Sequence, residues 1–147
     1  MNSIISWVGG KKALRDLIYL RMPGHYDRYI EVFGGGGWVL FGKPPDKCME
    51  VYNDFNSNLA NLFYCVKERP MALLRELSFL PLNSRDEFVT LRKFLTMEEF
   101  KSEHLAEELE IATHFLKEPE AAEICDILKE RAVVGDVKRA AAFYKII

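Results

Sequence analysis

The sequence has few cysteines and no long apolar run, and these shortages exclude several classes of protein. Its cysteines are three in number and contain no Cys-x-x-Cys pair, so neither a disulfide framework nor a zinc site is predicted; they are Cys48, Cys65 and Cys125. We expect free thiols in a reducing cytoplasm. Histidine is equally scarce, and the three that occur lack ligand-like neighbours, so we expect no metal; they are His25, His104 and His114.

Signals for membrane insertion or export are also missing. The chain does not begin with a basic region followed by an apolar stretch, and it lacks the run of about 18 apolar residues that a membrane helix needs. We therefore predict no membrane association and a cytoplasmic location. With 147 residues, the chain is long enough for one domain with a sizeable core.

Charge of one sign is not in excess, because 20 Lys and Arg residues oppose 22 Asp and Glu residues, for a net charge of −2. Only the distribution of charge is informative. Basic residues gather near the N-terminus, whereas residues 98–131 are strongly acidic. Phosphate binding needs Lys and Arg, so we expect the acidic segment to face away from nucleic acid. Ordinary solvated helix faces are the alternative for both groups.

Hydrophobic spacing predicts two short strands, at residues 29–33 and 48–52, in an otherwise helical chain. A short helix is expected over residues 11–20, and residues 38–41 are predicted to form the buried first turn of another helix. Two strands are too few for a free-standing parallel sheet. Their open edges predict cover by a second chain, by self-association or by helices packed onto the sheet.

Polar residues mark several helix starts in the second half of the chain. Capping boxes are predicted at residues 84–87 and 96–99, and Asp136 is expected to cap a last helix over residues 137–147. That helix is apolar, and the chain ends within it. Because natural C-termini are usually polar, we expect the chain to be cut short and the helix to lack its native neighbours.

Four consecutive glycines, residues 34–37, follow the first predicted strand. The dinucleotide fingerprint G-x-G-x-x-G is incomplete, since Val39 stands at its third glycine, and Gly42-Lys43-Pro44 is not a Walker motif. A flexible turn is the alternative. Four glycines lose much backbone entropy on folding, however, so we favour a loop that a ligand approaches closely.

The other candidate residues each have a structural alternative. Gly9, Gly10 and Lys11 can form an anion nest with Lys11 reaching a carboxylate or phosphate, or they can be a solvated loop. Trp7 can stack on a purine, although a core position is commoner for a lone tryptophan. Glu31 either faces solvent from its strand or accepts hydrogen bonds from a ligand ammonium group.

Asp54 follows the second predicted strand. An aspartate there commonly caps a helix, but Asn56 or Ser57 can cap the next helix instead, which leaves Asp54 for a ligand. An acidic residue at this strand end can accept both hydroxyls of a ribose. Together with the glycines, Asp54 predicts a nucleoside cofactor.

Taken together, these segments resemble the Dam-type DNA adenine-N6 methyltransferases of bacteria and phages. Residues 7–11 are similar to the family's W-x-G-G-K element, residues 31–39 to its E-P-F-x-G-x-G-x-V loop with Val32 in place of proline, and residues 53–56 to its N-D-x-N strand end. Residues 139–144 are similar to its R-A-x-x-F-x-Y helix. The resemblance covers residues 4–79 and 137–147.

The resemblance implies S-adenosylmethionine as cofactor and adenine in double-stranded DNA as substrate, as in restriction–modification systems. It assigns Trp7 and Lys11 to cofactor contacts, Phe33 and the glycines to the surroundings of methionine and adenosine, and Asp54 to the ribose. The cofactor-binding residues that we predict are Trp7, Gly9, Gly10, Lys11, Glu31, Phe33, Gly34, Gly35, Gly36 and Asp54.

The family's catalytic Asp-Pro-Pro-Tyr motif is absent from these 147 residues, where Pro44-Pro45-Asp46 has another order. We therefore predict no catalytic residue in the chain and expect the chain alone to be inactive. The motif's backbone and side chain would hold the amino group of a flipped adenine.

The fold class predicted is α/β: an incomplete doubly wound, Rossmann-like methyltransferase fold with a large helical C-terminal part. Residues 1–80 would bind S-adenosylmethionine, and residues 81–147 would lead toward the target-recognition and catalytic part. Two alternatives remain: a non-catalytic remnant or regulatory module that binds cofactor or a protein partner, and a phosphate-binding nucleotide protein that uses the four glycines.

Overall fold

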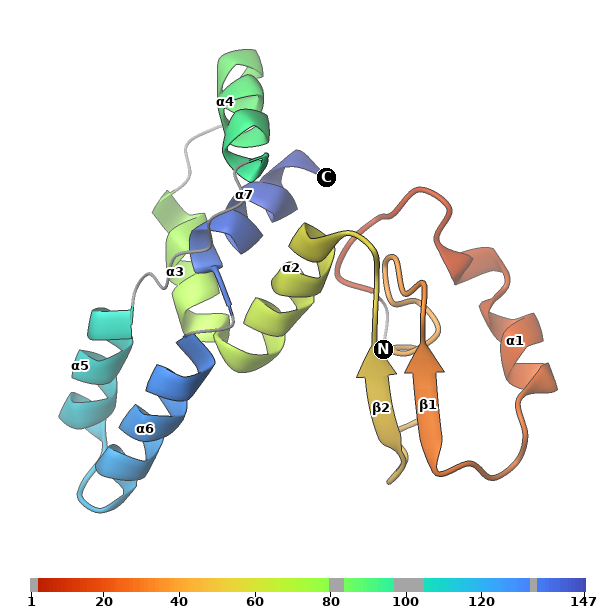
Figure 1. Cartoon of the computed structure of the whole chain (residues 1–147), viewed down its shortest axis with the longest axis horizontal. Helices are drawn as coiled ribbons and strands as arrows, with labels where there is room; N and C mark the ends of the chain where they lie inside the picture. The colour runs from red at the N-terminus through yellow and green to blue at the C-terminus, as the bar shows by residue number, and fades with distance from the viewer. Residues whose placement is uncertain (1–2, 80–83, 97–104, 133–134) are drawn as a thin grey trace. The chain divides into compact units, whose positions relative to one another are not determined.

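The structure is a computed structural model that describes residues 3–79, 84–96, 105–132 and 135–147 (Figure 1). The chain divides into two compact units, one formed by the residues up to Ala60 and the other by Asn61–Ile146. The boundary between them falls within helix α2 (Ser57–Glu68). The sequence predicts a division at residue 80, which concerns functional parts and not compact units. That division stays a prediction.

The N-terminal unit contains a two-stranded parallel sheet (Figure 1). Strand β1 (Arg28–Glu31) pairs with β2 (Met49–Tyr52), with Arg28 opposite Met49 and Glu31 opposite Tyr52. Both predicted strands are confirmed, with ends that differ by one or two residues. The pairing continues past β1, because the amide of Gly34 donates to the carbonyl of Asn53 at 2.9 Å.

The helix predicted over residues 11–20 is confirmed in place but not in form. It consists of a 3₁₀ turn, η1 (Lys11–Ala13), followed by the α-helix α1 (Arg15–Arg21). No residue of α1 is buried, and its apolar side chains Leu17 and Leu20 are 59% and 79% exposed. The apolar stripe of this helix therefore has little cover within the described chain.

The helical turn predicted at residues 38–41 is confirmed in part: the amide of Phe41 donates to the carbonyl of Gly37, four residues earlier, at 2.9 Å, but no helix follows. These residues form turns, and Val39 is buried as expected. Gly37 has a φ of 67°, in the left-handed region. The amide of Leu40 donates to the Glu31 carboxylate at 2.9 Å, not to a carbonyl four residues earlier. The amides of Phe41 and Lys43 do donate to carbonyls four residues earlier, so the segment forms isolated turns and not a continuous helix.

The second unit is helical in all its described parts. After α2 it contains α3 (Pro70–Phe79), α4 (Arg85–Leu95), α5 (Leu105–Phe115), α6 (Glu120–Ala132) and α7 (Val137–Ile146). Helix α5 packs against α6, and α7 packs against both α3 and α4 (Figure 1). The expectation that the last helix lacks neighbours is wrong, since Ala140 and Ala141 are fully buried.

Two of the predicted helix caps are confirmed. The Ser84 hydroxyl accepts from the Glu87 amide at 3.1 Å, and the Asp136 carboxylate accepts from the Arg139 amide at 2.8 Å. Such caps satisfy amides that have no partner within the helix. The second predicted box, at residues 96–99, lies largely outside the described residues, and Thr96 itself is the C-cap of α4.

A buried ion pair joins the helices of the second unit. Arg69, 1% exposed, lies between α2 and α3 and donates to the Glu108 carboxylate of α5 at 2.7 Å. The same guanidinium donates to the carbonyl of Gly135 at 3.2 Å, just before α7. One buried cation thus connects segments that are far apart in the sequence.

Candidate cofactor site and family

The candidate site lies in the N-terminal unit, where the parallel strands β1 and β2 end at the same edge of the sheet. The glycine segment 34–37 follows β1, and Asp54 follows β2 by two residues. In open α/β sheets, ligands bind beyond the carboxyl ends of the strands. The fold therefore brings two of the predicted binding segments together.

Asp54 connects the two strand ends directly. One oxygen of its carboxylate accepts from the amide of Gly35 at 2.8 Å, and the other accepts from the amide of Asn56 at 2.9 Å. Asn56 provides the cap of α2, because its side chain accepts from the amides of Asn58 and Leu59. The prediction that another residue caps this helix and not Asp54 is therefore confirmed. Each oxygen of the Asp54 carboxylate keeps a lone pair for a further donor.

Glu31 is buried at the end of β1, with 4% exposure. Its carboxylate accepts from the amide of Leu40 at 2.9 Å, from the ammonium of Lys11 at 3.2 Å and, more weakly, from the hydroxyl of Tyr29 at 3.4 Å. The solvent-facing alternative for Glu31 is therefore wrong. The carboxylate organises the turn after the glycines and holds one ammonium group.

Lys11 reaches across from η1 to the end of β1. Besides the Glu31 carboxylate, its ammonium contacts the backbone carbonyl of Phe33 through a short hydrogen bond. Its side chain is 33% exposed. The carboxylate that Lys11 reaches therefore belongs to its own chain, and the N-terminal segment is fastened to the strand that leads into the glycines.

The first glycine pair forms a tight turn. The amide of Gly10 donates to the carbonyl of Trp7 at 3.0 Å, so it is engaged within the chain. A Cβ atom on Gly10 would lie 2.9 Å from that same carbonyl, closer than real side chains approach. Gly9, with a φ of 75°, has open space around it. Of the pair, Gly9 is the position that faces free space.

Aromatic rings of the chain itself pack on the second glycine segment. A Cβ on Gly35 would lie 2.9 Å from the Trp7 ring, and one on Gly34 would lie 2.2 Å from the Tyr52 ring. A Cβ on Gly36 would lie 3.2 Å from the Trp38 ring. Packing of these rings is therefore one reason why only glycine fits at these positions. The close approach of a ligand would be a second reason.

Sequence reasoning missed Tyr52 and Trp38 as parts of this site. Trp38 directly follows the glycines, and a Cβ on either Gly10 or Gly36 would lie 3.2 Å from its ring, so it contacts both glycine segments. Tyr52 is the last residue of β2 and donates its hydroxyl to the carbonyl of Gly35 at 2.7 Å. Adjacency to the motifs is the signal that could have identified both.

Among the predicted residues that carry a side chain, Phe33 is the most exposed, at 75%. Gly34 and Gly36 are buried, whereas Trp7 and Asp54 are half-buried. Burial raises the pKa of Tyr52, and the Asp54 carboxylate raises it further. For Tyr29, burial and then Glu31 act in the same direction. Both hydroxyls therefore remain protonated donors at neutral pH.

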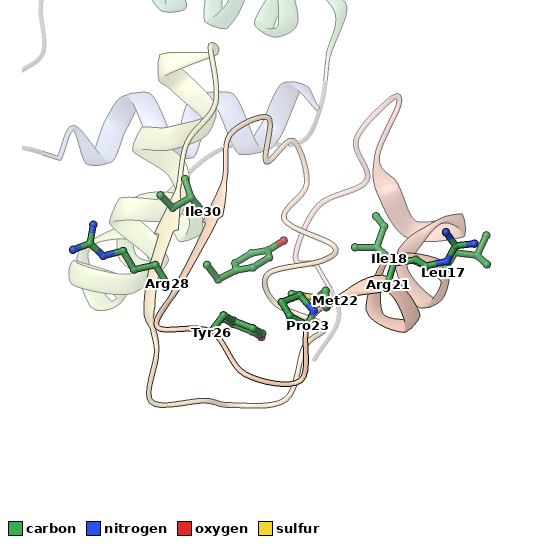
Figure 2. A pocket seen from close by; sticks show the side chains of 9 residues that line it. Leu17, Ile18, Arg21, Met22, Pro23, Tyr26, Arg28 and Ile30 are labelled. Carbon is green, nitrogen blue, oxygen red and sulfur yellow. The ribbon is translucent and has the colours of Figure 1, made fainter.

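A separate apolar cavity of 480 Å³ lies between α1 and β1 (Figure 2). Its lining includes Leu17, Ile18, Met22, Tyr26 and Ile30. None of the predicted cofactor residues lines it. We place the candidate site at the strand ends rather than in this cavity, because the polar groups that recognise a nucleoside gather at the strand ends.

Within the described ranges, no group of three potential ligands is arranged to hold a metal ion. No described helix is long and apolar enough to span a membrane.

Comparison with known proteins places the chain in a family. The family model of the D12 class N6 adenine-specific DNA methyltransferases matches residues 7–133. The type II methyltransferase M1.LlaDCHI of Lactococcus lactis subsp. cremoris is 38% identical over 93 residues, which are 63% of this chain and 32% of the relative. The type II methyltransferase M.MjaIII of Methanocaldococcus jannaschii is 33% identical over 98 residues, 62% of this chain and 32% of the relative.

The chain thus spans about a third of the length of these curated relatives. No solved structure matches it. The family match covers most of the chain, including the glycine segments and the strand ends described above. The chain belongs to the D12 class of N6 adenine-specific DNA methyltransferases.

Proposed function

We propose that this chain provides the S-adenosylmethionine-binding part of an enzyme that methylates adenine N6 in double-stranded DNA. The observation that carries the proposal is the hydrogen bond from the Gly35 amide to Asp54, which unites the glycine loop with the predicted ribose acceptor. The names of the relatives and of the family are in keeping with a methyltransferase.

The chemistry of the residues fits this cofactor at three points. Glu31 and the carbonyl of Phe33 accept from the ammonium of Lys11, so this strand end has acceptors of the kind that the amino group of the methionine moiety needs. The exposed Phe33 ring offers an apolar face to the adenosine. The Asp54 oxygens have lone pairs left for ribose hydroxyls.

In this proposal the chain's residues bind and orient the cofactor, which supplies the methyl group when bound. Trp7, through its contact with Gly35, and Lys11, through Glu31, support the loop. Gly9, Gly10, Gly34 and Gly36 complete the predicted set. Because no Asp-Pro-Pro-Tyr occurs in the 147 residues, we propose that the chain alone does not transfer methyl to DNA.

We also propose that the complete enzyme has a Rossmann-like, doubly wound fold. Parallel pairing and a ligand site beyond the strand ends support a Rossmann-like, doubly wound arrangement of which β1 and β2 are the first strands. Residues 1–80 would be the cofactor part and 81–147 the segment leading to target recognition. We further propose that the enzyme is cytoplasmic and modifies bacterial or phage DNA in a restriction–modification system.

Calorimetry with S-adenosylhomocysteine tests the cofactor assignment. Asp54→Asn should weaken binding by on the order of 1–3 kcal/mol, because an amide cannot accept from ribose and from Gly35 as a carboxylate does. Asp46→Asn is the matched control, since the exposed Asp46 also accepts from a backbone amide, that of Lys47 at 2.7 Å. Equal affinity of the wild type and Asp54→Asn would refute the assignment.

Two further measurements separate the alternatives. Tighter binding of ATP than of S-adenosylhomocysteine would favour a phosphate-binding nucleotide protein. Labelled methyl incorporated into adenine-containing duplex DNA by the purified chain would contradict the proposal that it is inactive alone. If a second polypeptide that carries Asp-Pro-Pro-Tyr restores methylation, the non-catalytic remnant is disfavoured.

A further inference from the structure

Gly35 is held through both of its backbone polar groups by residues at the end of one strand. Its amide donates to the Asp54 carboxylate at 2.8 Å, and its carbonyl accepts from the Tyr52 hydroxyl at 2.7 Å. Gly35 itself has a φ of 52°. Both hydrogen bonds therefore fix an otherwise flexible glycine in one left-handed conformation.

The Tyr52 ring restrains the neighbouring residue as well. It packs so closely on Gly34 that a Cβ there would lie 2.2 Å from the ring. The Gly34 amide donates to the carbonyl of Asn53, the residue after Tyr52. Tyr52 thus presents a flat surface to the loop while its hydroxyl reaches one residue further.

Tyr52 is well placed to transmit rigidity to the loop. It ends β2 and lies opposite Glu31 in the parallel register, so the strand pair fixes its backbone. Because burial and Asp54 both raise its pKa, the hydroxyl stays a donor throughout the neutral range. A tyrosine here can therefore order the loop before any ligand arrives.

We propose that Tyr52 is a positioning residue of the cofactor site. Tyr52 acts through its hydrogen bond to the Gly35 carbonyl and not through a contact with the ligand. It orders the loop in advance, so that the loop loses less conformational entropy when the ligand binds. This inference rests on the proposed function only for the identity of the ligand. The ordering of the loop is a property of the free protein and can be measured without one.

The test compares Tyr52→Phe with Tyr19→Phe. Tyr19 is a matched control, because its hydroxyl also donates to a backbone carbonyl in the same unit, that of Val39, at 2.7 Å. Both variants keep the ring and lose one hydrogen bond, so a purely structural role predicts similar falls in melting temperature and no other difference.

Hydrogen exchange of the free protein is measured first. Tyr52→Phe should speed exchange of the Gly35 amide about fivefold, because the bond from Tyr52 to the Gly35 carbonyl no longer opposes local opening of the loop, whereas Tyr19→Phe should leave the exchange unchanged. Unchanged exchange in Tyr52→Phe would overturn the proposal, as would an equal rise in both variants.

Affinity for S-adenosylhomocysteine is measured next by calorimetry. Tyr52→Phe should bind about fivefold more weakly than the wild type, and Tyr19→Phe should bind as the wild type does. If both variants keep wild-type affinity, Tyr52 does not position the site. If the wild type itself does not bind, the proposed function fails, while the exchange result still decides whether Tyr52 orders the loop.

Discussion

The amide of Gly35 donates to the carboxylate of Asp54 across 2.8 Å, although 19 residues separate them. This bond means that Asp54 would have two roles, as a proposed ribose acceptor and as a fastener of the glycine loop. Replacing Asp54 by alanine would remove both at once. Affinity measurements on that variant alone would therefore overstate the contribution of the ribose contact.

Gly35→Ala should destabilise the N-terminal unit. The φ of 52° is unfavourable for alanine, and the added Cβ would lie 2.9 Å from the Trp7 ring. We expect a loss of roughly 1–3 kcal/mol in the free energy of unfolding, measured with urea. Gly24→Ala is the control, because a Cβ there meets nothing within 4 Å. An equal effect of the two substitutions would contradict the packing of Trp7 on the loop.

Glu108→Ala should destabilise the helical unit far more than Glu107→Ala. Glu108 pairs with the buried Arg69, and its removal leaves that cation without its carboxylate partner. Glu107 pairs with Arg75 at 3.6 Å, and both side chains are more than 40% exposed. Urea denaturation should give losses of about 3–5 kcal/mol for Glu108 and about 0–1 kcal/mol for Glu107. Similar losses would show that the Arg69 pair is not buried in solution.

Local signals in the sequence predicted the elements well. Short apolar runs located both strands, and the caps of α4 and α7 were predicted from Ser84 and Asp136, because a cap and its target amide are only three residues apart. The proximity of Asp54 to the glycines was also predictable, since parallel strands end at the same edge. These inferences need no knowledge of distant packing.

Long-range partners could not be predicted in the same way. Nothing near Glu31 in the sequence indicates that Lys11 and Leu40 would satisfy its carboxylate, so its burial was left open. The bond from Leu40 was equally invisible in the sequence around residues 38–41, where the predicted turn forms but does not lead into a helix. The contact of the Tyr52 ring with Gly34 likewise depends on how β1 and β2 pair, a relationship between residues that are far apart in the sequence.

The Lys11–Glu31 pair should show a strong coupling energy. The Glu31 carboxylate is buried, so the pair is screened less than a surface ion pair, and Lys11→Met would leave Glu31 without its ammonium partner. A double-mutant cycle of Lys11→Met and Glu31→Gln, measured by urea unfolding, should give a coupling of on the order of 1–3 kcal/mol. The Arg15–Asp16 pair, whose carboxylate is 85% exposed, serves as the control and should give well below about 1 kcal/mol. A coupling near zero for both pairs would contradict the contact.

Cys65 should make folding less favourable at alkaline pH. The side chain is fully buried, and burial raises the pKa of its thiol to about 12 from the ordinary 9.0. The folded state holds the thiol proton more tightly than the unfolded state does. The resulting contribution to the free energy of unfolding is complete below pH 9.0 and is lost as the pH rises toward 12.

The loss in the free energy of unfolding that is due to Cys65 should reach about 1.4 kcal/mol at one pH unit above the ordinary thiol pKa. Urea unfolding at pH 8 and 10 measures it, with Cys65→Ala as the variant whose stability should fall less. Alkylation of the native protein at pH 8 provides a second check, since the half-buried Cys48 and Cys125 should react before Cys65. Equal pH dependence of the wild type and Cys65→Ala would contradict the predicted shift.

Self-association through the strands stays one of two predictions for the sheet, the other being cover by the chain's own helices. Ile30 of β1 and Met49 of β2 are 54% and 59% exposed, and the apolar cavity adjoins β1 (Figure 2). An open strand with apolar side chains tends to pair with another chain unless a charge blocks it. Sedimentation at several concentrations should therefore show larger species for the wild type, and Ile30→Lys should suppress them. Val8→Lys is the control, because Val8 is 98% exposed but lies outside the strands. A wild type that stays monomeric at every concentration would refute this association, and suppression by both substitutions would attribute it to charge and not to the strand.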